Sequence, residues 1–168
     1  MSRDTKMQPT LAHEIKTVLI NYFKTQFILM LIVTAIVWGG LYLINLKYAL
    51  LLAFGAGALS VIPLFGMTLA SIIISLVAIF DQSTFLPDTP PFFEGLVIFL
   101  VFLVINFLID YLLTPHILSK TTKINPVVLL LTVFLGTAFF NFIGAFLAIP
   151  ALLTAKTIWK YFKERKPL

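Results

Sequence analysis

Residues Ile105–Pro126 read I-N-F-L-I-D-Y-L-L-T-P-H-I-L-S-K-T-T-K-I-N-P. The start of this stretch belongs to a long apolar run that begins at Gly95, and polar side chains interrupt the run near its end. Asn106 and Asp110 are spaced i, i+4 and therefore share one helical face. Thr114 extends that face by another turn, and Pro115 is expected to break the backbone. An ionisable side chain costs about 2.5–3.5 kcal/mol at the centre of a membrane span, so it usually faces a bundle interior or a cavity. The pattern predicts a polar site here; the alternative is that Asp110 lies at headgroup depth, where water solvates its charge.

The composition is that of an integral membrane protein. Of the 168 residues, 60% are hydrophobic and 11% are charged, against about 25% charged in soluble domains. The apolar runs suit helices rather than the alternating strands of about ten residues that build membrane barrels. We therefore expect an all-α fold, a polytopic helical membrane protein with broken helices or re-entrant hairpins, in a single membrane domain over residues 1–168. Cysteine is absent, and no motif predicts a cofactor or a metal.

Charge predicts the topology. The formal net charge of +5 comes from basic residues that cluster at the two ends of the chain, which we interpret as topology signals and lipid contacts, not as a nucleic-acid surface. The N-terminus, Lys120, Lys123 and the tail Lys160–Leu168 are expected on the cytoplasmic side of the inner membrane. The loop Asp81–Glu94 is expected on the outer side, with a solvated rim of three acids: Asp81, Asp88 and Glu94.

The N-terminal region predicts a surface helix followed by a span. From Thr10 to Lys24, apolar and polar residues fall on opposite helical faces, which indicates an amphipathic interfacial helix over residues 10–26. A cytosolic helix that packs on a partner subunit fits the same pattern. The transmembrane bundle then occupies residues 27–168, and its first span is Phe27–Ile44.

The segment Tyr48–Phe80 is too long for one perpendicular span. Gly57, Pro63 and Gly66 stand at its centre, and a proline removes a backbone donor and clashes with the preceding turn. We therefore expect two half-length segments that meet at Ser60–Gly66 as a broken helix or hairpin. Backbone groups freed there must be buried in protein or line a cavity. One long, kinked and tilted helix is the alternative.

A second interrupted region lies near the C-terminus. Two apolar segments, Pro126–Phe140 and Gly144–Trp159, flank Asn141, which is expected at a hairpin tip or in a turn. Pro150 interrupts the second segment. Across the whole chain, the expected hinge or hairpin positions are Gly57, Pro63, Gly66, Pro115, Asn141, Gly144 and Pro150.

The two interrupted regions share a short pattern. G-A-L-S-V-I-P, from Gly57 to Pro63, and G-A-F-L-A-I-P, from Gly144 to Pro150, match in register at Gly, Ala, Ile and Pro. Paired interrupted segments are the best sequence pointer to the binding region of a transporter. A match of seven apolar residues also arises by chance, so an internal repeat and a coincidence both remain open.

Four motifs together resemble one family of membrane proteins. They are V-I-P-L-F-G (Val61–Gly66), I-D-Y-L-L-T-P-H-I-L (Ile109–Leu118), N-P-V-V-L-L-L (Asn125–Leu131) and F-N-F-I-G-A-F-L-A-I-P (Phe140–Pro150). In this order and spacing they resemble the C-terminal half of the autoinducer-2 exporter (AI-2E) family, also called PerM-type permeases. The chain departs from the family pattern at two positions. Tyr111 replaces the amide that commonly follows the motif aspartate, and Asn141 stands where a glycine is common.

The resemblance implies a multi-span permease that forms homo-oligomers. Some members export the quorum-sensing signal autoinducer-2, and others are linked to sodium/proton exchange. We therefore expect a secondary transporter of a small polar solute or cation. Asp110 would be its coupling or substrate-contacting group, with Asn106 and Thr114 as hydrogen-bonding neighbours. An ion gradient would drive transport because the sequence has no P-loop.

Two other functions stay open at this point. One is a sodium/proton antiporter of the same family, and the other is a truncated membrane scaffold or partner subunit without transport of its own. An enzyme is not expected, because the sequence has neither a zinc-protease motif nor a nucleophile elbow. The expected partners are the lipid bilayer, the solute or cation and further copies of the chain.

Overall fold

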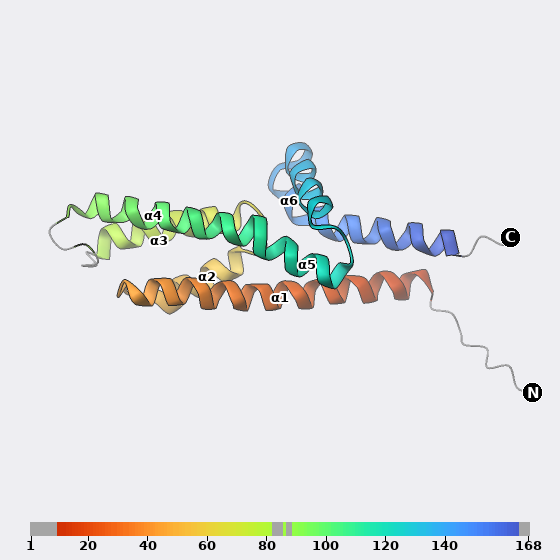
Figure 1. Cartoon of the computed structure of the whole chain (residues 1–168), viewed down its shortest axis with the longest axis horizontal. Helices are drawn as coiled ribbons and strands as arrows, with labels where there is room; N and C mark the ends of the chain where they lie inside the picture. Colours follow the sequence, from red (N-terminus) through yellow and green to blue (C-terminus); the bar gives the residue numbers. More distant parts are fainter. Residues whose placement is uncertain (1–9, 82–85, 87–88, 165–168) are drawn as a thin grey trace, which may run out of the picture.

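The computed structural model describes residues 10–81, 86 and 89–164, and helices dominate them (Figure 1). The elements are α1 (Leu11–Leu43), α2 (Ala49–Leu59), α3 (Gly66–Asp81), α4 (Pro91–Leu108), the π-helical turn η1 (Ile109–Leu113), α5 (Thr114–Thr122) and α6 (Pro126–Glu164). No strand occurs among the described residues, and the all-α prediction is confirmed. Within the described part of the chain, three helical stretches are long and apolar enough to cross a membrane: Leu11–Leu43, Pro91–Thr122 and Pro126–Glu164.

Helix α1 runs without interruption from the predicted surface segment into the first span. The side-chain oxygen of Thr10 caps its start and accepts a hydrogen bond from the backbone N–H of His13 at 3.4 Å. We expected a surface helix over residues 10–26, followed by a transmembrane bundle from residue 27. In the structure no helix boundary separates these two parts, because α1 continues through residues 26 and 27. A helix lying in the membrane plane would need a bend before the span, and α1 shows none there (Figure 1). Residues 10–26 therefore extend the first span as one rod, and their contact with the membrane surface stays a prediction.

Helices α2 and α3 form a hairpin, as the sequence predicted. The chain reverses after α1 through a turn in which Asn45 and Tyr48 have positive φ, and α2 packs back along α1. Helix α3 then returns alongside α4 (Figure 1). The link between α2 and α3, Ser60–Phe65, lies partway along the bundle rather than at its end (Figure 1). Gly66 permits this sharp reversal, because a Cβ there would overlap the carbonyl of Leu59.

A π-helical turn joins α4 to α5, so the backbone break expected at Pro115 is wrong. The backbone N–H of Thr114 donates to the carbonyl of Ile109, five residues earlier, which widens the turn. Pro115 has no N–H to give, and its ring would clash with the carbonyl four residues earlier in a regular helix. The wider turn accommodates the proline, and the helix continues through it to Thr122.

Helix α6 consists of two limbs, 126–139 and 142–164, that fold into a second hairpin. Phe140 and Asn141 leave helical geometry, and Asn141 has φ 51° and ψ −135°. The limbs approach closely at Gly136 and Gly144, because a Cβ on either glycine would overlap the backbone of the other. Asn141 therefore lies at the hairpin tip. Pro150 does not interrupt the helix, since the non-helical residues inside α6 are Phe140 and Asn141.

The two matching heptapeptides do not occupy equivalent positions. Gly57–Pro63 ends α2 and enters its hairpin tip, whereas Gly144–Pro150 follows the other tip and lies within a limb. What they share is a closely packed glycine: a Cβ on Gly57 would overlap the hydroxyl of Thr34 on α1. The match is therefore not an internal structural repeat.

The structure groups the helix ends at two opposite ends of the bundle, and which end faces the cytoplasm stays a prediction. The start of α1 and the end of α6 lie at one end, and the end of α3 and the start of α4 lie at the other (Figure 1). At the latter end, a carboxylate oxygen of Asp81 accepts a hydrogen bond from the backbone N–H of Lys47 at 3.1 Å. Glu94 is only 4% exposed, so it is not part of a solvated rim. Asp88 and residues 1–9 and 165–168 lie outside the described residues.

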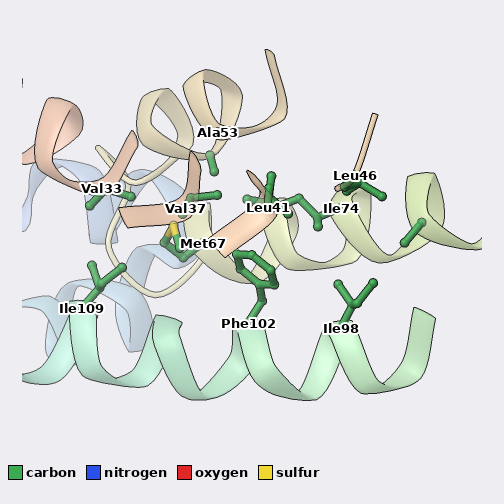
Figure 2. Packing of buried hydrophobic residues seen from close by; sticks show 13 residues of the cluster. Val33, Val37, Leu41, Leu46, Ala53, Met67, Ile74, Ile98, Phe102 and Ile109 are labelled. Atoms are coloured by element: carbon green, nitrogen blue, oxygen red, sulfur yellow. The ribbon is translucent and has the colours of Figure 1, made fainter. Parts of the chain in front are cut away.

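Two apolar clusters hold the hairpins in place. The first joins α1, α2, α3, α4 and η1, and Figure 2 shows Phe102 of α4 pointing toward Leu41 of α1 and the neighbouring α3. The second joins α1, α5 and α6 through Leu29, Leu118, Leu129 and Leu153, among others. The α2–α3 hairpin therefore belongs to the first cluster, and the α6 hairpin to the second.

Candidate functional site

Asp110 holds the tip of the α2–α3 hairpin. Its Oδ2 accepts a hydrogen bond from the backbone N–H of Leu64 at 3.2 Å. Leu64 follows Pro63 in the tip and has φ 69°, a left-handed conformation that costs a non-glycine residue about 1–3 kcal/mol. Because lipid offers no partner to a freed backbone N–H, the carboxylate provides one inside the protein. Asp110 is 8% exposed, so it is buried among protein groups rather than solvated at headgroup depth.

Asn106 extends these polar contacts to α3. With its amide turned so that both ends find partners, its nitrogen donates to Asp110 Oδ2 at 2.9 Å. Its oxygen then accepts from Thr68, at 3.0 Å from Oγ1 and 3.3 Å from the backbone nitrogen. In the opposite orientation, the amide nitrogen donates to Thr68 Oγ1 at 3.0 Å. In this second orientation the single proton of the Thr68 hydroxyl is left to donate to the carbonyl of Leu64, at 2.9 Å. The hairpin tip, α3, α4 and η1 thus share one hydrogen-bond network.

The π-helical turn η1 places two residues against two different hairpins. Asp110 contacts the α2–α3 tip, as described above. Tyr111 stacks on Phe107 with 4.8 Å between ring centroids, and its ring lies 6.1 Å from that of Phe134 in the first limb of α6. Such turns occur frequently at functional sites in helical proteins. Here the turn brings the acid to one hairpin and the aromatic ring to the other.

Two cavities meet at Asp110. One has a volume of about 250 Å³ and lies between α3 and the α4–η1 helix, where Thr68, Asn106, Phe107 and Tyr111 line it. The other, of about 20 Å³, has room for one water molecule and is lined by Pro63, Thr114, Pro115 and residues of α5 and α6. Asp110 and Leu64 line both cavities, so their hydrogen bond lies where the two adjoin.

The tips of the two hairpins touch. Phe65, in the α2–α3 tip, and Phe142, next to Asn141 in α6, lie edge to face with 5.9 Å between ring centroids. The two interrupted regions of the sequence are therefore neighbours in space. One tip lies on each side of this ring contact, and the two tips together border the site.

The three residues predicted for transport or coupling lie close together in the structure, and their roles stay predictions. Asp110 and Asn106 share the network, and Thr114 lines the small cavity with Pro63 and Pro115. The other expected hinge positions lie farther out: Gly57 and Gly66 flank the first tip, Asn141 and Gly144 form the second, and Pro150 lies deeper in the second limb. Among the described residues, no group of three His, Cys, Asp or Glu side chains gathers as a metal site.

Other residues of the site were not predicted. Leu64 takes part through its backbone N–H, so no side-chain pattern signals it. Thr68 is a polar residue on an apolar helix, and the signal that identified Asn106 would have identified it too. The pairing of Phe65 with Phe142 depends on packing between distant segments, which a single sequence does not reveal.

Comparisons with known proteins agree with the sequence motifs. A family model described as "AI-2E family transporter" matches residues 2–164. The protein named "Putative transport protein YtvI" of Bacillus subtilis (strain 168) is 29% identical over 170 aligned residues, which cover 95% of this chain and 43% of that protein. "Putative transport protein YrrI" of the same organism is 26% identical over 142 residues, which cover 84% of this chain and 38% of that protein. The chain thus spans about two fifths of the length of these relatives, and no solved structure matches it.

Proposed function

Because this chain belongs to the AI-2E family of transporters, we propose that it carries a small polar solute across the membrane through the site at Asp110. The hydrogen bond between Asp110 and Leu64 supports this proposal most directly. A neutral asparagine or serine would satisfy a backbone N–H at lower cost than a carboxylate buried in a membrane span. A carboxylate placed against a hairpin tip therefore suits a contact that is made and broken during function.

The bound solute forms hydrogen bonds with the two groups that otherwise bond to each other, the Asp110 carboxylate and the Leu64 N–H. A hydroxyl or amine that donates to Asp110 replaces the N–H of Leu64, and the tip of the hairpin is released. The freed N–H lies just before the start of α3, where the helix dipole also favours an acceptor oxygen of the solute. Both ends of a small polar molecule are then bound. Displacement of the tip joins the cavity of about 250 Å³ to the smaller one beside α6.

Protonation of Asp110 can change this hydrogen-bond network through the orientation of the Asn106 amide. An ionised Asp110 accepts from the amide nitrogen, which turns the amide oxygen toward Thr68. A protonated Asp110 can instead donate to the amide oxygen, which turns the nitrogen toward Thr68. Each protonation state thus favours one arrangement of the contacts around the tip. This coupling supports an ion gradient as the driving force.

The proposed sidedness follows from charge. The start of α1 and the end of α6 face the cytoplasm in a cytoplasmic membrane, because basic residues are retained on that side. Lys120 lies in the last turn of α5 and Lys123 caps it, and Lys123 lines a pocket together with residues from the start of α1. The α3–α4 link then faces outward. We further propose that the active form is a homo-oligomer, as the resemblance to the family implies.

Flux through reconstituted protein tests the proposal. The full chain is placed in liposomes, and uptake of autoinducer-2, ribose and radiolabelled sodium is measured under an imposed pH gradient. At least one probe should cross above the level of empty liposomes, and Asp110→Asn should reduce that flux to the empty-liposome level while membrane insertion is unchanged. Asp81→Asn is the matched control, because it alters a carboxylate at the end of the bundle, and it should retain the flux. Equal transport by Asp110→Asn would remove this residue from the mechanism, and flux that needs a second protein would make the chain a partner subunit.

A further inference from the structure

A pocket separate from the cavities at Asp110 lies where the start of α1 meets the ends of α5 and α6. Its volume is about 480 Å³, and three elements line it. His13 comes from α1, Lys123 follows α5, and Lys156 and Lys160 come from the second limb of α6. Glu14 is the one acid among the lining residues, so three lysines leave the pocket with a positive charge.

Lys156 organises the pocket. Its ammonium group donates to the carbonyls of Thr122 and Lys123, at 3.2 and 2.9 Å. These carbonyls lie at the C-terminus of α5, so the ammonium group caps this helix end. Its positive charge also offsets the negative end of the helix dipole. An ammonium has three donors, so within the described structure the third is left for a ligand.

The other lysines are also available to an anion. Lys160 lies 3.8 Å from Glu164, but both side chains are about two thirds exposed, so this ion pair binds Lys160 only weakly. The hydroxyl of Thr17 in the lining already donates to a backbone carbonyl of its own helix. Ammonium groups are therefore the main donors that the pocket offers.

Exposed aromatic rings place the pocket near a membrane surface. Trp159 is 75% exposed and Phe162 is 62% exposed, and both lie on the limb that carries Lys156 and Lys160. Tryptophan is enriched at the depth of lipid headgroups, where its apolar ring and polar nitrogen are both accommodated. The pocket lysines are interleaved with these rings along the helix, so they reach the same depth as lipid phosphates.

We propose that this pocket binds the phosphate group of an anionic ligand between α1, α5 and α6. The exposed rings favour the headgroup of an anionic phospholipid as the source of the phosphate, and a free phosphate in the cytoplasm is the other source. Bound phosphate links Lys123, next to α5, with Lys156 and Lys160 on α6. It therefore fixes the base of the α6 hairpin, whose tip contacts the transport site.

Binding by the full chain in a neutral detergent tests the proposal. Native mass spectrometry and titration calorimetry compare dioctanoyl phosphatidylglycerol, dioctanoyl phosphatidylcholine and inorganic phosphate. Phosphatidylglycerol should bind at least tenfold more tightly than phosphatidylcholine. Lys123→Gln and Lys156→Gln should each weaken that binding about fivefold, as expected for one lysine near an anionic surface. Lys120→Gln and Lys163→Gln are matched controls outside the pocket lining, and each should change binding less than twofold.

Each outcome decides between these possibilities. If inorganic phosphate binds with the same dependence on Lys123 and Lys156 while phosphatidylglycerol does not bind, the pocket holds a free phosphate. Equal binding of the two lipids without phosphate binding, or equal losses in pocket and control variants, overturns the proposal. If Lys156→Gln does not fold because α5 loses its cap, Lys123→Gln carries the test, since only the backbone carbonyl of Lys123 takes part in that cap.

Discussion

The ring of Phe65 packs edge to face against the ring of Phe142, with 5.9 Å between their centroids. Each residue lies at the tip of a hairpin, and the first tip is also the one whose Leu64 N–H is bound by Asp110. A solute that releases the first tip must therefore also disturb its contact with the second. The two hairpins should move in a coordinated way during transport.

Joining the two tips covalently should stop transport. The chain has no cysteine, so Phe65→Cys and Phe142→Cys introduce the only thiols, and a short bis-methanethiosulfonate reagent can bridge them. We expect the bridged double variant to lose at least nine tenths of its flux in liposomes and to regain it after reduction. Each single variant treated with the same reagent serves as the control and should keep its flux. Full flux in the bridged protein would show that the tips do not separate.

Water should reach α3 at the cavity beside Asp110 but not at the exposed apolar surface one turn further along the helix. Thr68→Cys places a thiol in the cavity of about 250 Å³, whereas Ile72→Cys, one turn further along α3, places it on a surface that is 42% exposed and apolar. A charged methanethiosulfonate reagent should modify the first variant in membranes and leave the second unmodified, because such reagents do not enter lipid. Labelling is measured by mass shift. Equal labelling of both thiols would contradict a hydrated cavity.

The sequence predicted those features that depend on one segment at a time. The cost of an acid in a span identified Asp110, and Pro63 with its neighbouring glycines predicted the first hairpin without knowledge of any partner. The continuity of α1 was missed, because an amphipathic pattern suits a surface helix and a helix packed on protein equally well. In the structure Tyr22 is buried at 3% exposure in the cluster with α5 and α6.

Features that depend on backbone adjustment or distant contacts were beyond a single sequence. A proline inside a helix predicts a break, but the π-helical turn η1 absorbs Pro115 instead. The partner of Asp110 is a backbone group of Leu64, whose identity depends on how the tip folds. Tyr111 stands where the family commonly has an amide directly after the motif aspartate. Asn106, one turn earlier, nevertheless brings an amide to the same carboxylate.

Close packing of α1 and α2 should make Gly57 intolerant of even one added methyl group. A Cβ at Gly57 would overlap the hydroxyl of Thr34 and approach the Met30 carbonyl to 2.7 Å, whereas a Cβ at Gly55 meets nothing within 4 Å. We expect Gly57→Ala to lower the free energy of unfolding by about 1–3 kcal/mol, as overpacked sites do. Gly55→Ala should leave it unchanged or raise it by up to about 1 kcal/mol through helix propensity. Detergent denaturation followed by circular dichroism measures both, and equal effects would refute the close contact.

The hairpin tip at Asn141 should be more stable with glycine. Its φ of 51° and ψ of −135° lie near backbone conformations that glycine adopts readily and that cost other residues about 1–3 kcal/mol. Asn141→Gly should therefore raise the free energy of unfolding by about 1 kcal/mol, part of the relieved strain being offset by the greater entropy of glycine in the unfolded chain. Asn141→Val should lower it, because a β-branched side chain tolerates positive φ least. The same denaturation assay ranks the unmodified chain, Asn141→Gly and Asn141→Val by stability. If the valine variant is as stable as the glycine variant, residue 141 does not have this backbone conformation.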